Sequence, residues 1–347
     1  MTARNGRRVG MRDVAERAGV AISSVSRVLS GNPDVSTVMR NRVEDAVAAL
    51  GYERDLIAQS MRSGRTMSIG FVAIDVANPV IAANSAGAVT ELRKAGYSLL
   101  MSNSRGDPAL DAEHIRHFEL RRVDGLVLSL ADERHPRTLD VLRKFEGPIV
   151  LIDRSLPADI PAGAVVHNHA EGMVPAAEHL LDLGHRRLAL INGAPNVRPS
   201  RERAAAVRRA VKGRSGATLN VRAGSYSAEH GYDATLAAFA EPRPPTAVIV
   251  GGNQILQGVM RALRDLGRRI PDDVSLVTFD TVPLAEFLEP PLACVVRDPI
   301  EVGRQAAALL LEQIEGAEPR TVTVPTEFVP AGSCAAPPKR PGARAAE

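Results

Sequence analysis

The segment from Met11 to Leu29, MRDVAERAGVAISSVSRVL, constrains the fold of this chain more than any other stretch. Ala15, Gly19 and Val25 have the spacing of two short helices that cross closely around a tight turn. The small side chain of Ala15 permits the close crossing, and Gly19 accepts the positive φ that the turn needs. Apolar residues pack the pair together, namely Val14, Ala18, Val20, Val25 and Val28. The pattern predicts a helix-turn-helix.

The second predicted helix has a polar face made of Ser23, Ser24, Ser26 and Arg27, and this face is free to enter the major groove of DNA. Residues 1–65 carry eleven arginines and no lysine against seven acidic residues, whereas the whole chain has a net charge of only +3. Positive charge is therefore concentrated on the part that would meet phosphates. A plain helical hairpin or a solvated basic surface would account for each feature alone. Together the features favour DNA binding.

A third helix and a connector follow the helix pair. Ser36 can cap a helix that runs to about Leu50, and Gly51 can end it. A further short helix is predicted from about Asp55 to Arg62, followed by a glycine-containing connector.

From Met67 onward, apolar runs alternate with helical stretches, which predicts parallel sheets covered by helices on both faces. The predicted strands are 68–74, 98–102, 125–130, 149–152, 188–191, 219–222, 247–250 and 275–279. The predicted helices include 82–95, 108–121, 171–183, 201–212, 228–240 and 253–266. These units are too many for one compact sheet, so we expect two α/β lobes. Residues 335–347 are rich in proline and alanine and are expected to be disordered.

The sequence lacks the usual signatures of catalysis. It contains no P-loop, no GxGxxG after a strand and no GxSxG. His114 and His117 share a predicted helix, and His167 and His169 share a strand-to-helix junction. Neither pair has a cysteine or carboxylate at metal-ligand spacing, so we expect ordinary surface or hydrogen-bonded histidines. We predict a binding protein rather than an enzyme, with no metal and no cofactor.

Cysteine usage and hydropathy indicate the cellular compartment. Cys294 and Cys334 are the only cysteines, so there is no disulfide framework, as is typical of a reducing cytoplasm. No run of eighteen apolar residues could span a membrane, and the basic N-terminus leads into a polar helix rather than an apolar signal segment. We therefore expect a cytoplasmic protein.

Several stretches in a fixed order carry a resemblance to a known family. They are RDVAERAGV and SSVSRVLSGNPDVS, VEDAVAALGY, LIAQSMRSGRTMSIGFV, VDGLVL, LIDR, HLLDLGHRRLALING, RIPDDVSLVTFD and RDPIEVGRQAAALLLEQIEG. From Met11 to about Ser333 the chain resembles the LacI/GalR family of bacterial transcription regulators. The resemblance implies a repressor whose affinity for a double-stranded DNA operator is controlled allosterically by a small polar metabolite, in particular a sugar.

The family also implies a domain plan. An all-α helix-turn-helix headpiece would occupy residues 1–54, and a hinge helix with its linker residues 55–66. A two-lobed α/β core with parallel sheets, like the periplasmic binding proteins, would occupy residues 67–334. The N-lobe would take about 67–165 and 293–323, and the C-lobe about 166–292 and 324–334, with crossings near Val166, Leu292 and Val324. The core would form a homodimer, because the tail after Cys334 has no leucine for a tetramerising heptad.

The resemblance places DNA contacts on the headpiece and hinge, at Ile22, Ser23, Ser24, Arg27, Ser36 and Met61. Arg27 can make a bidentate contact to guanine, Ser23 a hydrogen bond, and Ile22 an apolar contact to a thymine methyl group. Met61 would insert into the minor groove at the operator centre, where the family usually has leucine.

Three other residues, at two sites, depart from the family pattern. Ala21 replaces the usual Ser or Thr cap before the recognition helix, and Arg54–Asp55 replaces the usual Pro-Asn. Losing the cap costs about 0.5–2 kcal/mol of helix stability, and the carboxylate of Asp55 is repelled by DNA. These changes predict weaker non-specific binding without its loss.

In the cleft between the lobes, the resemblance points to effector contacts at Asp153, Arg203, Tyr226, Asn253 and Asp280. Arg203 and Asp280 offer a charged, bidentate pair that can hold hydroxyls or a carboxylate. Gln254 stands where the family often has an acid, and Val80 and Ile81 where it often has aromatic residues. With 3% aromatic residues and no tryptophan, stacking on a flat heterocycle is disfavoured. A sugar or another small polyhydroxylated or carboxylated metabolite is favoured.

Two alternatives belong to other classes of protein. A periplasmic solute-binding protein would share the core but lack the helix-turn-helix and carry a signal peptide. An α/β enzyme would carry one of the missing catalytic motifs.

Overall fold

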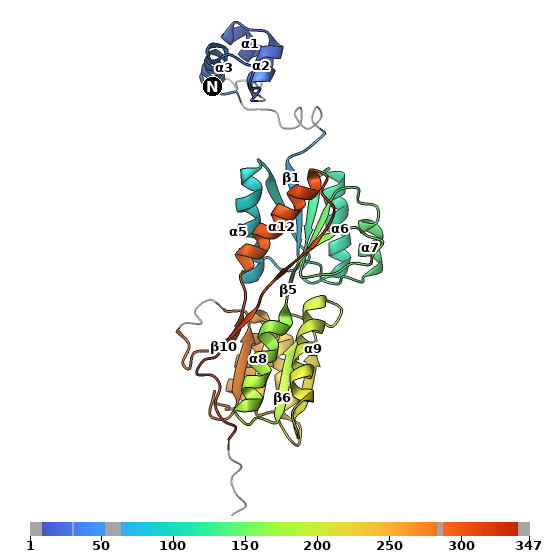
Figure 1. Ribbon diagram of the computed structural model, residues 1–347, viewed down its shortest axis with the longest axis vertical. Helices are drawn as coiled ribbons and strands as arrows, with labels where there is room; N and C mark the ends of the chain where they lie inside the picture. Colours follow the sequence, from blue (N-terminus) through green and yellow to red (C-terminus); the bar gives the residue numbers. More distant parts are fainter. Residues whose placement is uncertain (1–8, 30, 53–63, 283–286, 339–347) are drawn as a thin grey trace, which may run out of the picture. The chain divides into compact units, whose positions relative to one another are not determined.

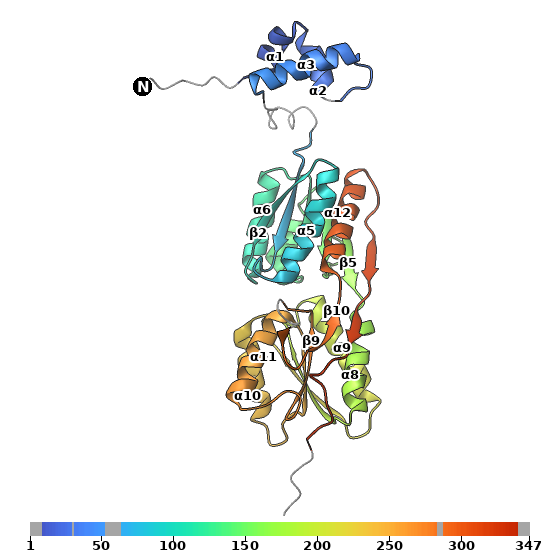
Figure 2. The same ribbon diagram turned by 90° about the vertical axis from the view of Figure 1, so that its left-hand side faces the viewer.

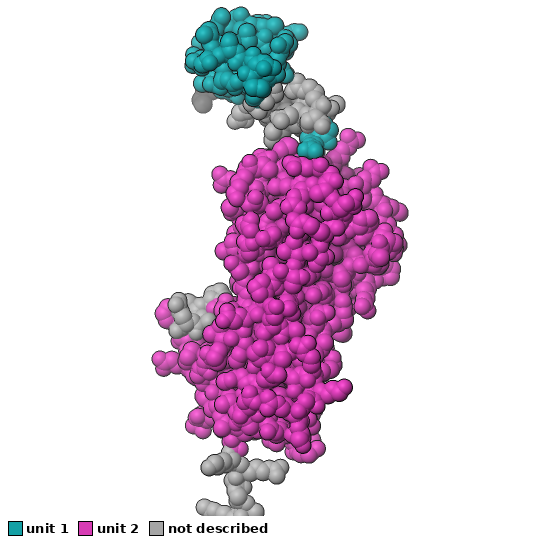
Figure 3. All heavy atoms as spheres, viewed as in Figure 1, with its two compact units in different colours: residues 1–66 teal, residues 67–347 magenta. Residues whose placement is uncertain are grey.

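The computed structural model describes residues 9–29, 31–52, 64–282 and 287–338 of the 347-residue chain. The chain divides into two compact units, residues Met1–Thr66 and residues Met67–Glu347 (Figure 3). Within the described ranges, no helix is both long enough and apolar enough to cross a membrane.

The described residues of the first unit form a headpiece of three helices, α1 (Met11–Ala18), α2 (Ile22–Leu29) and α3 (Thr37–Leu50). Gly19 ends α1 with a φ of 66°, a left-handed conformation that glycine adopts without steric cost. The Ser36 hydroxyl caps α3 by accepting a hydrogen bond from the Met39 N–H at 3.4 Å. Val14 of α1 and Val25 of α2 are fully buried between the helices. The predicted helix-turn-helix is confirmed, whereas the predicted hinge helix lies outside the described residues.

The second unit contains two six-stranded sheets, with the orders β11-β5-β4-β3-β1-β2 and β12-β10-β9-β8-β6-β7 (Figures 1 and 2). The strands of the first sheet are β1 Ser68–Ala73, β2 Ser98–Asn103, β3 Gly125–Leu128, β4 Ile149–Ile152, β5 Gly163–His167 and β11 Thr321–Val324. Those of the second are β6 Arg187–Asn192, β7 Thr218–Ala223, β8 Ala247–Val250, β9 Ser275–Phe279, β10 Ala293–Val296 and β12 Glu327–Val329. Neighbouring strands run parallel, except β10 and β12. The predicted two-lobed α/β core is confirmed.

Helices cover both faces of each sheet. The first lobe has α5 Pro79–Lys94, α6 Pro108–Leu120, α7 Pro136–Leu142 and α12 Pro299–Ile314, and the second has α8 His169–Asp182, α9 Arg198–Lys212, α10 Ala228–Phe239 and α11 Asn253–Asp265. The predicted start of the first core helix at residue 82 is three residues late. Asn78 caps α5 by accepting a hydrogen bond from the Val80 N–H, and Pro79 occupies the first helical position, where its missing N–H costs nothing.

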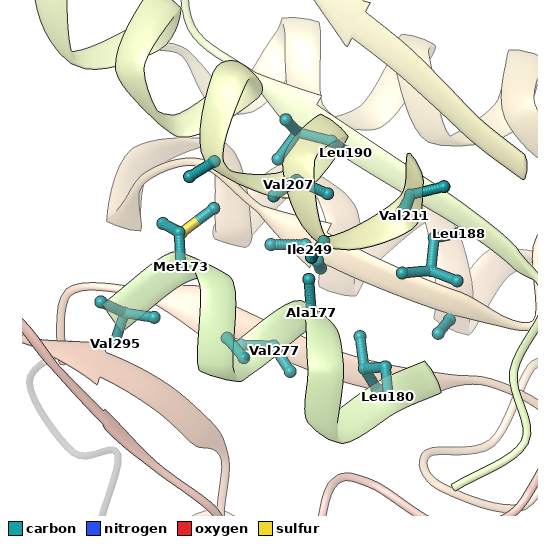
Figure 4. Close-up of a cluster of buried hydrophobic side chains, with 14 of the residues drawn as sticks. Met173, Ala177, Leu180, Leu188, Leu190, Val207, Val211, Ile249, Val277 and Val295 are labelled. Carbon is teal, nitrogen blue, oxygen red and sulfur yellow. The ribbon is translucent and has the colours of Figure 1, made fainter. Parts of the chain in front are cut away.

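Alternation along the strands divides each lobe into two apolar layers. In β1, Ile69 and Phe71 pack against α5 and α12, whereas Val72 packs against α6 and α7 on the other face. In β6, Leu188 and Leu190 pack against α8 and α9. Figure 4 shows this second layer, in which Met173, Ala177, Leu180, Val207, Val211, Ile249, Val277 and Val295 are also labelled. Side chains on alternate strand positions point to opposite faces of a sheet, so each central strand is buried on both sides.

The chain crosses between the lobes three times, after β5, after β10 and after β11. The expected lobe boundary near Leu292 is wrong, because residues 293–296 form β10, which pairs in parallel with β9 of the second sheet. The second crossing therefore follows Val296. The first boundary also moves, because β5 stays in the first sheet through His167. Strands β5, β10, β11 and β12 were not among the predicted strands.

Candidate functional site

In the headpiece, α2 presents a polar face away from the apolar centre. Ile22 is 43% exposed, and Ser23 and Arg27 are exposed, whereas Val25 and Val28 are buried. One face of the helix thus anchors it and the other offers side chains for contact, as a recognition helix requires.

The structure describes some of the other headpiece and hinge positions that the sequence singled out, and not others. Ser24 is half-buried, and Ser36 is exposed while it caps α3. The Ala21 carbonyl accepts hydrogen bonds from the Ser24 and Val25 N–H groups, but its methyl group cannot cap the remaining N–H groups. Met61, Arg54 and Asp55 lie outside the described residues.

A cavity of about 760 Å³ lies between the two lobes of the core, within the usual size range of small-molecule sites. All five residues predicted to bind an effector line it, namely Asp153, Arg203, Tyr226, Asn253 and Asp280. Asp153 follows β4 and Asp280 follows β9, so both lie at carboxyl ends of parallel strands, where ligands bind in such sheets. Val80 and Ile81 also line the cavity.

Asp153 is buried in a network of hydrogen-bonded side chains. Its carboxylate lies 3.1 Å from His167 Nδ1, 3.0 Å from His169 Nε2 and 2.9 Å from Arg198 Nη1. Burial opposes its ionisation, but the contacts with His169 and His167 hold the pKa of Asp153 well below its ordinary value. Both carboxylate oxygens therefore have protein partners already.

Asp280 has a bidentate partner that the sequence did not reveal. Arg297 donates from Nε to Oδ1 at 2.5 Å and from Nη2 to Oδ2 at 2.8 Å. Arg297, which directly follows β10, reaches this carboxylate from the adjacent strand, whereas the predicted role of Arg203 and Asp280 as a pair that holds a ligand stays a prediction. Burial opposes the ionisation of Asp280, but the charge and hydrogen bonds of Arg297 lower its pKa.

Arg203 on α9 is buried beneath the cavity. Its guanidinium carbon lies 3.6 Å from the centre of the Phe279 ring, Nη1 donates to the Gly251 carbonyl oxygen, and Nε donates to His169 Nδ1 at 3.4 Å. Burial lowers the pKa of Arg203. In Arg297 burial acts in the same direction, but the charge of Asp280 outweighs it and the pKa is raised.

Tyr226 lies in a space that a glycine leaves open. A methyl group added to Gly193 would lie 2.1 Å from the Tyr226 ring, so a larger residue there would displace the ring. The Tyr226 hydroxyl is fixed by the Ser200 hydroxyl at 2.7 Å. The tyrosine thereby presents a fixed aromatic surface to the cavity.

Amide side chains join the two lobes at another wall of the cavity. Asn253 Nδ2 donates to Asn78 Oδ1 at 2.9 Å, and Gln254 Nε2 donates to Asp75 Oδ2 at 2.5 Å. An ion pair between Arg201 of α9 and the buried Glu133 of the first lobe adds a further link. Gln254 thus works as an inter-lobe donor, which an acidic residue at this position could not do while ionised.

Asp153, His167 and His169 place three possible metal-ligand atoms within 4.8 Å of one another. Two guanidinium groups contact the same carboxylate, Arg198 at 2.9 Å and Arg297 at 3.6 Å. Their charges balance the carboxylate and would repel a metal cation, so the arrangement fits a hydrogen-bonded network better. Burial lowers the pKa of His167, and it lowers that of His169 to about 4.

The residues that sequence reasoning missed are His167, His169, Arg198 and Arg297. Arg297 begins the RDPIEVGRQ stretch that carries part of the family resemblance, and His167 and His169 share a strand-to-helix junction, but the carboxylate they surround is distant in the sequence. Position is a further signal, because His167 ends a strand and Arg297 follows one at a lobe crossing. His167 and His169 are buried and hydrogen-bonded rather than on the surface.

A small helix-turn-helix headpiece joined to a two-lobed, cleft-containing core defines a ligand-responsive DNA-binding protein. Comparisons with known proteins agree with this class. Residues 10–55 match the model for bacterial regulatory proteins of the lacI family, and residues 177–334 match the periplasmic binding protein-like domain.

Named relatives extend over nearly the whole chain. The ribose operon repressor of Escherichia coli (strain K12) is 31% identical over 310 residues, covering 88% of this chain and 92% of the relative. The HTH-type transcriptional repressor PurR of Mannheimia succiniciproducens is 29% identical over 327 residues, covering 92% and 96%. The crystal structure of the lac repressor dimer bound to operator and the anti-inducer ONPF superposes with a TM-score of 0.82 at 25% identity, covering 95% of this chain and 100% of that one. This chain belongs to the lacI family of bacterial regulatory proteins, and is a DNA-binding transcriptional regulator.

Proposed function

We propose that this protein is a repressor that binds a two-fold symmetric operator as a homodimer and has no catalytic activity of its own. A small polar metabolite of the sugar class controls its operator affinity from the cleft between the core lobes. The observation that carries this proposal is that one inter-lobe cavity is lined by all five residues that the family resemblance predicted as effector contacts. The names of the relatives, which are repressors, support it.

The headpiece supplies sequence recognition. Arg27, Ser23 and Ile22 project from the exposed side of α2, and their chemistry suits guanine, a permissive hydrogen bond and a thymine methyl group, respectively. Ser24 and Ser36 contribute contacts to the DNA backbone. Met61 is the apolar wedge at the operator centre.

The core supplies the ligand site. Tyr226 provides an aromatic face, Asn253 an amide that donates and accepts, and Asp280 and Arg203 charged groups for hydroxyls. Asp153, whose oxygens already have partners, shapes the wall by holding His167 and Arg198 in place.

Ligand binding is coupled to DNA through the lobe crossings. His167 and Arg297 lie at two of the three crossings, and both border the cavity or its network. A ligand that contacts both lobes binds the alternative arrangements of the lobes with different affinities. This difference in affinity shifts the equilibrium between those arrangements.

The test of DNA recognition begins with an operator selected from a random duplex library. Against this operator, Arg27→Ala should lose about 1–3 kcal/mol of binding free energy, concentrated at one base pair, and keep its binding to random DNA of equal length. Fluorescence anisotropy at fixed salt measures both. An equal loss on both duplexes would show a phosphate contact and refute the assignment of Arg27.

The homodimer is tested by analytical ultracentrifugation. Sedimentation of a stable monomer or tetramer at micromolar concentration would refute the dimer.

A further inference from the structure

One face of helix α5 forms part of the wall of the inter-lobe cavity. Asn78, which caps the helix, and Ile81 and Asn84, at successive intervals of three residues, all line the cavity. Side chains three or four residues apart lie on the same side of a helix. The amide oxygen of Asn78 is already used, since it accepts hydrogen bonds from the Val80 N–H and from Asn253 Nδ2. Asn84 is then the polar residue of this face whose amide is not committed to the helix cap.

Asn84 is buried without a hydrogen-bond partner for its amide oxygen. Only 2% of the residue is exposed, and no described residue donates to Oδ1. Its neighbour Ser85 is also buried, but the Ser85 hydroxyl donates to the Ile81 carbonyl oxygen at 2.7 Å. Nearly all buried polar groups in native proteins are hydrogen-bonded, and leaving an acceptor unpaired is costly. The buried acceptor of Asn84 thus calls for a donor from outside the chain.

Position separates Asn84 from the other side chains that have a buried polar atom without a partner. Among the described residues of this kind, Asn84 and Asn196 line the cavity. Asn196 belongs to the loop between β6 and α9 and is half-buried, whereas Asn84 lies on a helix and is buried. Asn84 therefore combines an unpaired acceptor, burial and a place in the cavity wall.

Close helix packing holds Asn84 at this place. A methyl group added to Gly303 of α12 would lie 1.8 Å from the Asn84 carbonyl oxygen. One added to Gly87, further along α5, would lie 2.0 Å from the Ile300 carbonyl oxygen. The two glycines let the backbones of α5 and α12 come close, so α5 is held against α12 along the stretch that carries Asn84. The terminal torsion of asparagine is broad, so the amide itself can still turn toward the cavity. A binding group on a rigid helix is positioned more precisely than one on a loop.

We propose that Asn84 determines the specificity of the effector site by hydrogen-bonding one hydroxyl group of a neutral sugar. This inference rests on the proposed function of the cleft as the effector site. A hydroxyl group can donate to Oδ1 and accept from Nδ2, whereas an ionised carboxylate brings no donor for Oδ1. A deoxy analogue would leave the buried acceptor unpaired, and a site built to hydrogen-bond a hydroxyl discriminates strongly against such an analogue.

The full-length wild-type protein is first screened with neutral sugars, namely D-ribose, D-xylose, D-glucose, D-galactose and D-mannose. Thermal-shift assays select the tightest binder. Titration calorimetry then measures the affinity of this parent sugar and of its monodeoxy analogues, in which one hydroxyl at a time is replaced by hydrogen. We expect at least one analogue to bind about tenfold or more weakly than the parent sugar.

Asn84→Leu is titrated with the same compounds. Leucine has a similar volume but no polar group, so the parent sugar should bind about tenfold or more weakly than it binds the wild type. One hydroxyl group, the partner of Asn84, should cease to matter, because its deoxy analogue should bind this variant within twofold of the parent sugar. The penalties for removing the other hydroxyls should be the same in both proteins. Asn84→Ala gives the same test if leucine does not fit.

Ser85→Ala is the matched control, since it removes a buried hydroxyl from the neighbouring position of the same helix, away from the cavity wall. It should keep the affinity for the parent sugar within twofold and keep every deoxy penalty. Circular dichroism compares the fold of each variant with that of the wild type. A merely structural role of Asn84 would weaken all compounds by one factor and leave the deoxy penalties as in the wild type, which overturns the specificity role.

Other outcomes separate this inference from the function on which it rests. A sugar that binds the wild type and Asn84→Leu equally and alters operator affinity overturns the role of Asn84 and keeps the effector function. A sugar whose binding depends on Asn84 but which leaves operator affinity unchanged keeps the specificity role and overturns the switch. If no sugar of the panel binds the wild type, the sugar class fails, and the role of Asn84 as a hydroxyl contact fails with it.

Discussion

The two lobes of the core have the same strand order but different charges at equivalent positions. Asp153 follows β4 and Asp280 follows β9, which are the third strands from corresponding edges of their sheets. Both aspartates have positive φ, 52° and 69°. Each donates its N–H to the neighbouring strand, Asp153 to Val165 and Asp280 to Val295. The same backbone device therefore presents a carboxylate at the cleft from each lobe.

The neighbouring strand ends differently in the two lobes. The register of β4 with β5 and of β9 with β10 makes His167 and Arg297 equivalent. Asp280 is neutralised by Arg297, which is adjacent in its own lobe, whereas Asp153 contacts His167 and His169 and takes further balancing charge from Arg198 and Arg297. The charge of Asp153, in the first lobe, is thus balanced by arginines of the second lobe. The hydrogen-bonded network around Asp153 is therefore sensitive to how the two lobes are arranged.

The largest effect is expected from exchanging the equivalent residues for glutamine. Arg297→Gln leaves Asp280 buried without its cation and should lower the free energy of unfolding of the core by about 3–5 kcal/mol. His167→Gln should cost about 1 kcal/mol, because Asp153 keeps its arginines. Urea unfolding monitored by circular dichroism measures both, with the exposed Arg208→Gln as control. Similar losses of unfolding free energy in the two variants would show that Asp280 and Asp153 depend equally on these two partners, and would contradict the difference between the lobes.

Two buried helix glycines, one in each lobe, face different kinds of atom, although a methyl group added to Gly258 of α11 in the second lobe would also meet backbone, 1.8 Å from the Ala228 carbonyl oxygen. In the first lobe, a methyl group added to Gly303 of α12 would lie 1.8 Å from the Asn84 carbonyl oxygen of α5. In the second, one added to Gly172 of α8 would lie 2.3 Å from Val295 Cγ1, a side-chain atom. Because backbone cannot move aside as a side chain can, Gly303→Ala should cost about 3 kcal/mol and Gly172→Ala about 1–2 kcal/mol. Thermal denaturation ranks the variants, and the reverse ranking would contradict this explanation.

Acid should act on the two lobes in opposite directions. Burial lowers the pKa of His169 from 6.5 to about 4. As the pH falls, the unfolded chain therefore binds this proton before the folded chain does. The stability that His169 contributes is fully present above pH 6.5 and is lost as the pH falls toward 4. Between pH 7 and pH 5 the free energy of unfolding should decrease by about 2 kcal/mol. Burial raises the pKa of Asp111 in the first lobe from 3.8 to about 6. Here the folded chain binds the proton before the unfolded chain does, so the same acidification should add about 1 kcal/mol to the free energy of unfolding.

Two variants separate these contributions. His169→Gln should reduce the loss of stability between pH 7 and pH 5, and Asp111→Asn should increase it, as measured by urea unfolding at both values. If both variants followed the wild-type pH profile, neither group would titrate in this range as the structure indicates.

The smallest effect is expected at the amide contacts between the lobes. Gln254→Ala removes the hydrogen bond to Asp75 and one to Asn78, which lie at a partly exposed wall. The variant should lose less than about 1 kcal/mol of unfolding free energy. Its ligand affinity should change, because two hydrogen bonds that hold the lobes together around the cleft are absent. Calorimetry with a sugar that the wild-type protein binds checks this expectation, and unchanged affinity would show that these bonds do not contribute to closure.

The sequence by itself determined the features that depend on local patterns. The spacing of Ala15, Gly19 and Val25 predicted the headpiece, because helix crossing and a left-handed turn restrict residue type at fixed intervals. Alternating apolar runs and helices predicted the two α/β lobes. Resemblance then placed five residues that line one cavity. The hinge helix and Met61 stay predictions.

Only the tertiary structure decided which charges meet. His167, Arg198 and Arg297 are far apart in the sequence, and they converge on Asp153 because β5 and β10 end, and α9 begins, close to this carboxylate. The same arrangement pairs Asp280 with Arg297 and leaves Arg203 hydrogen-bonded to His169 and the Gly251 carbonyl oxygen. Local periodicity contains no information about such pairings, since they depend on strand order and on where the chain changes lobes. The charge that the cleft presents to a ligand is therefore a property of the assembled fold.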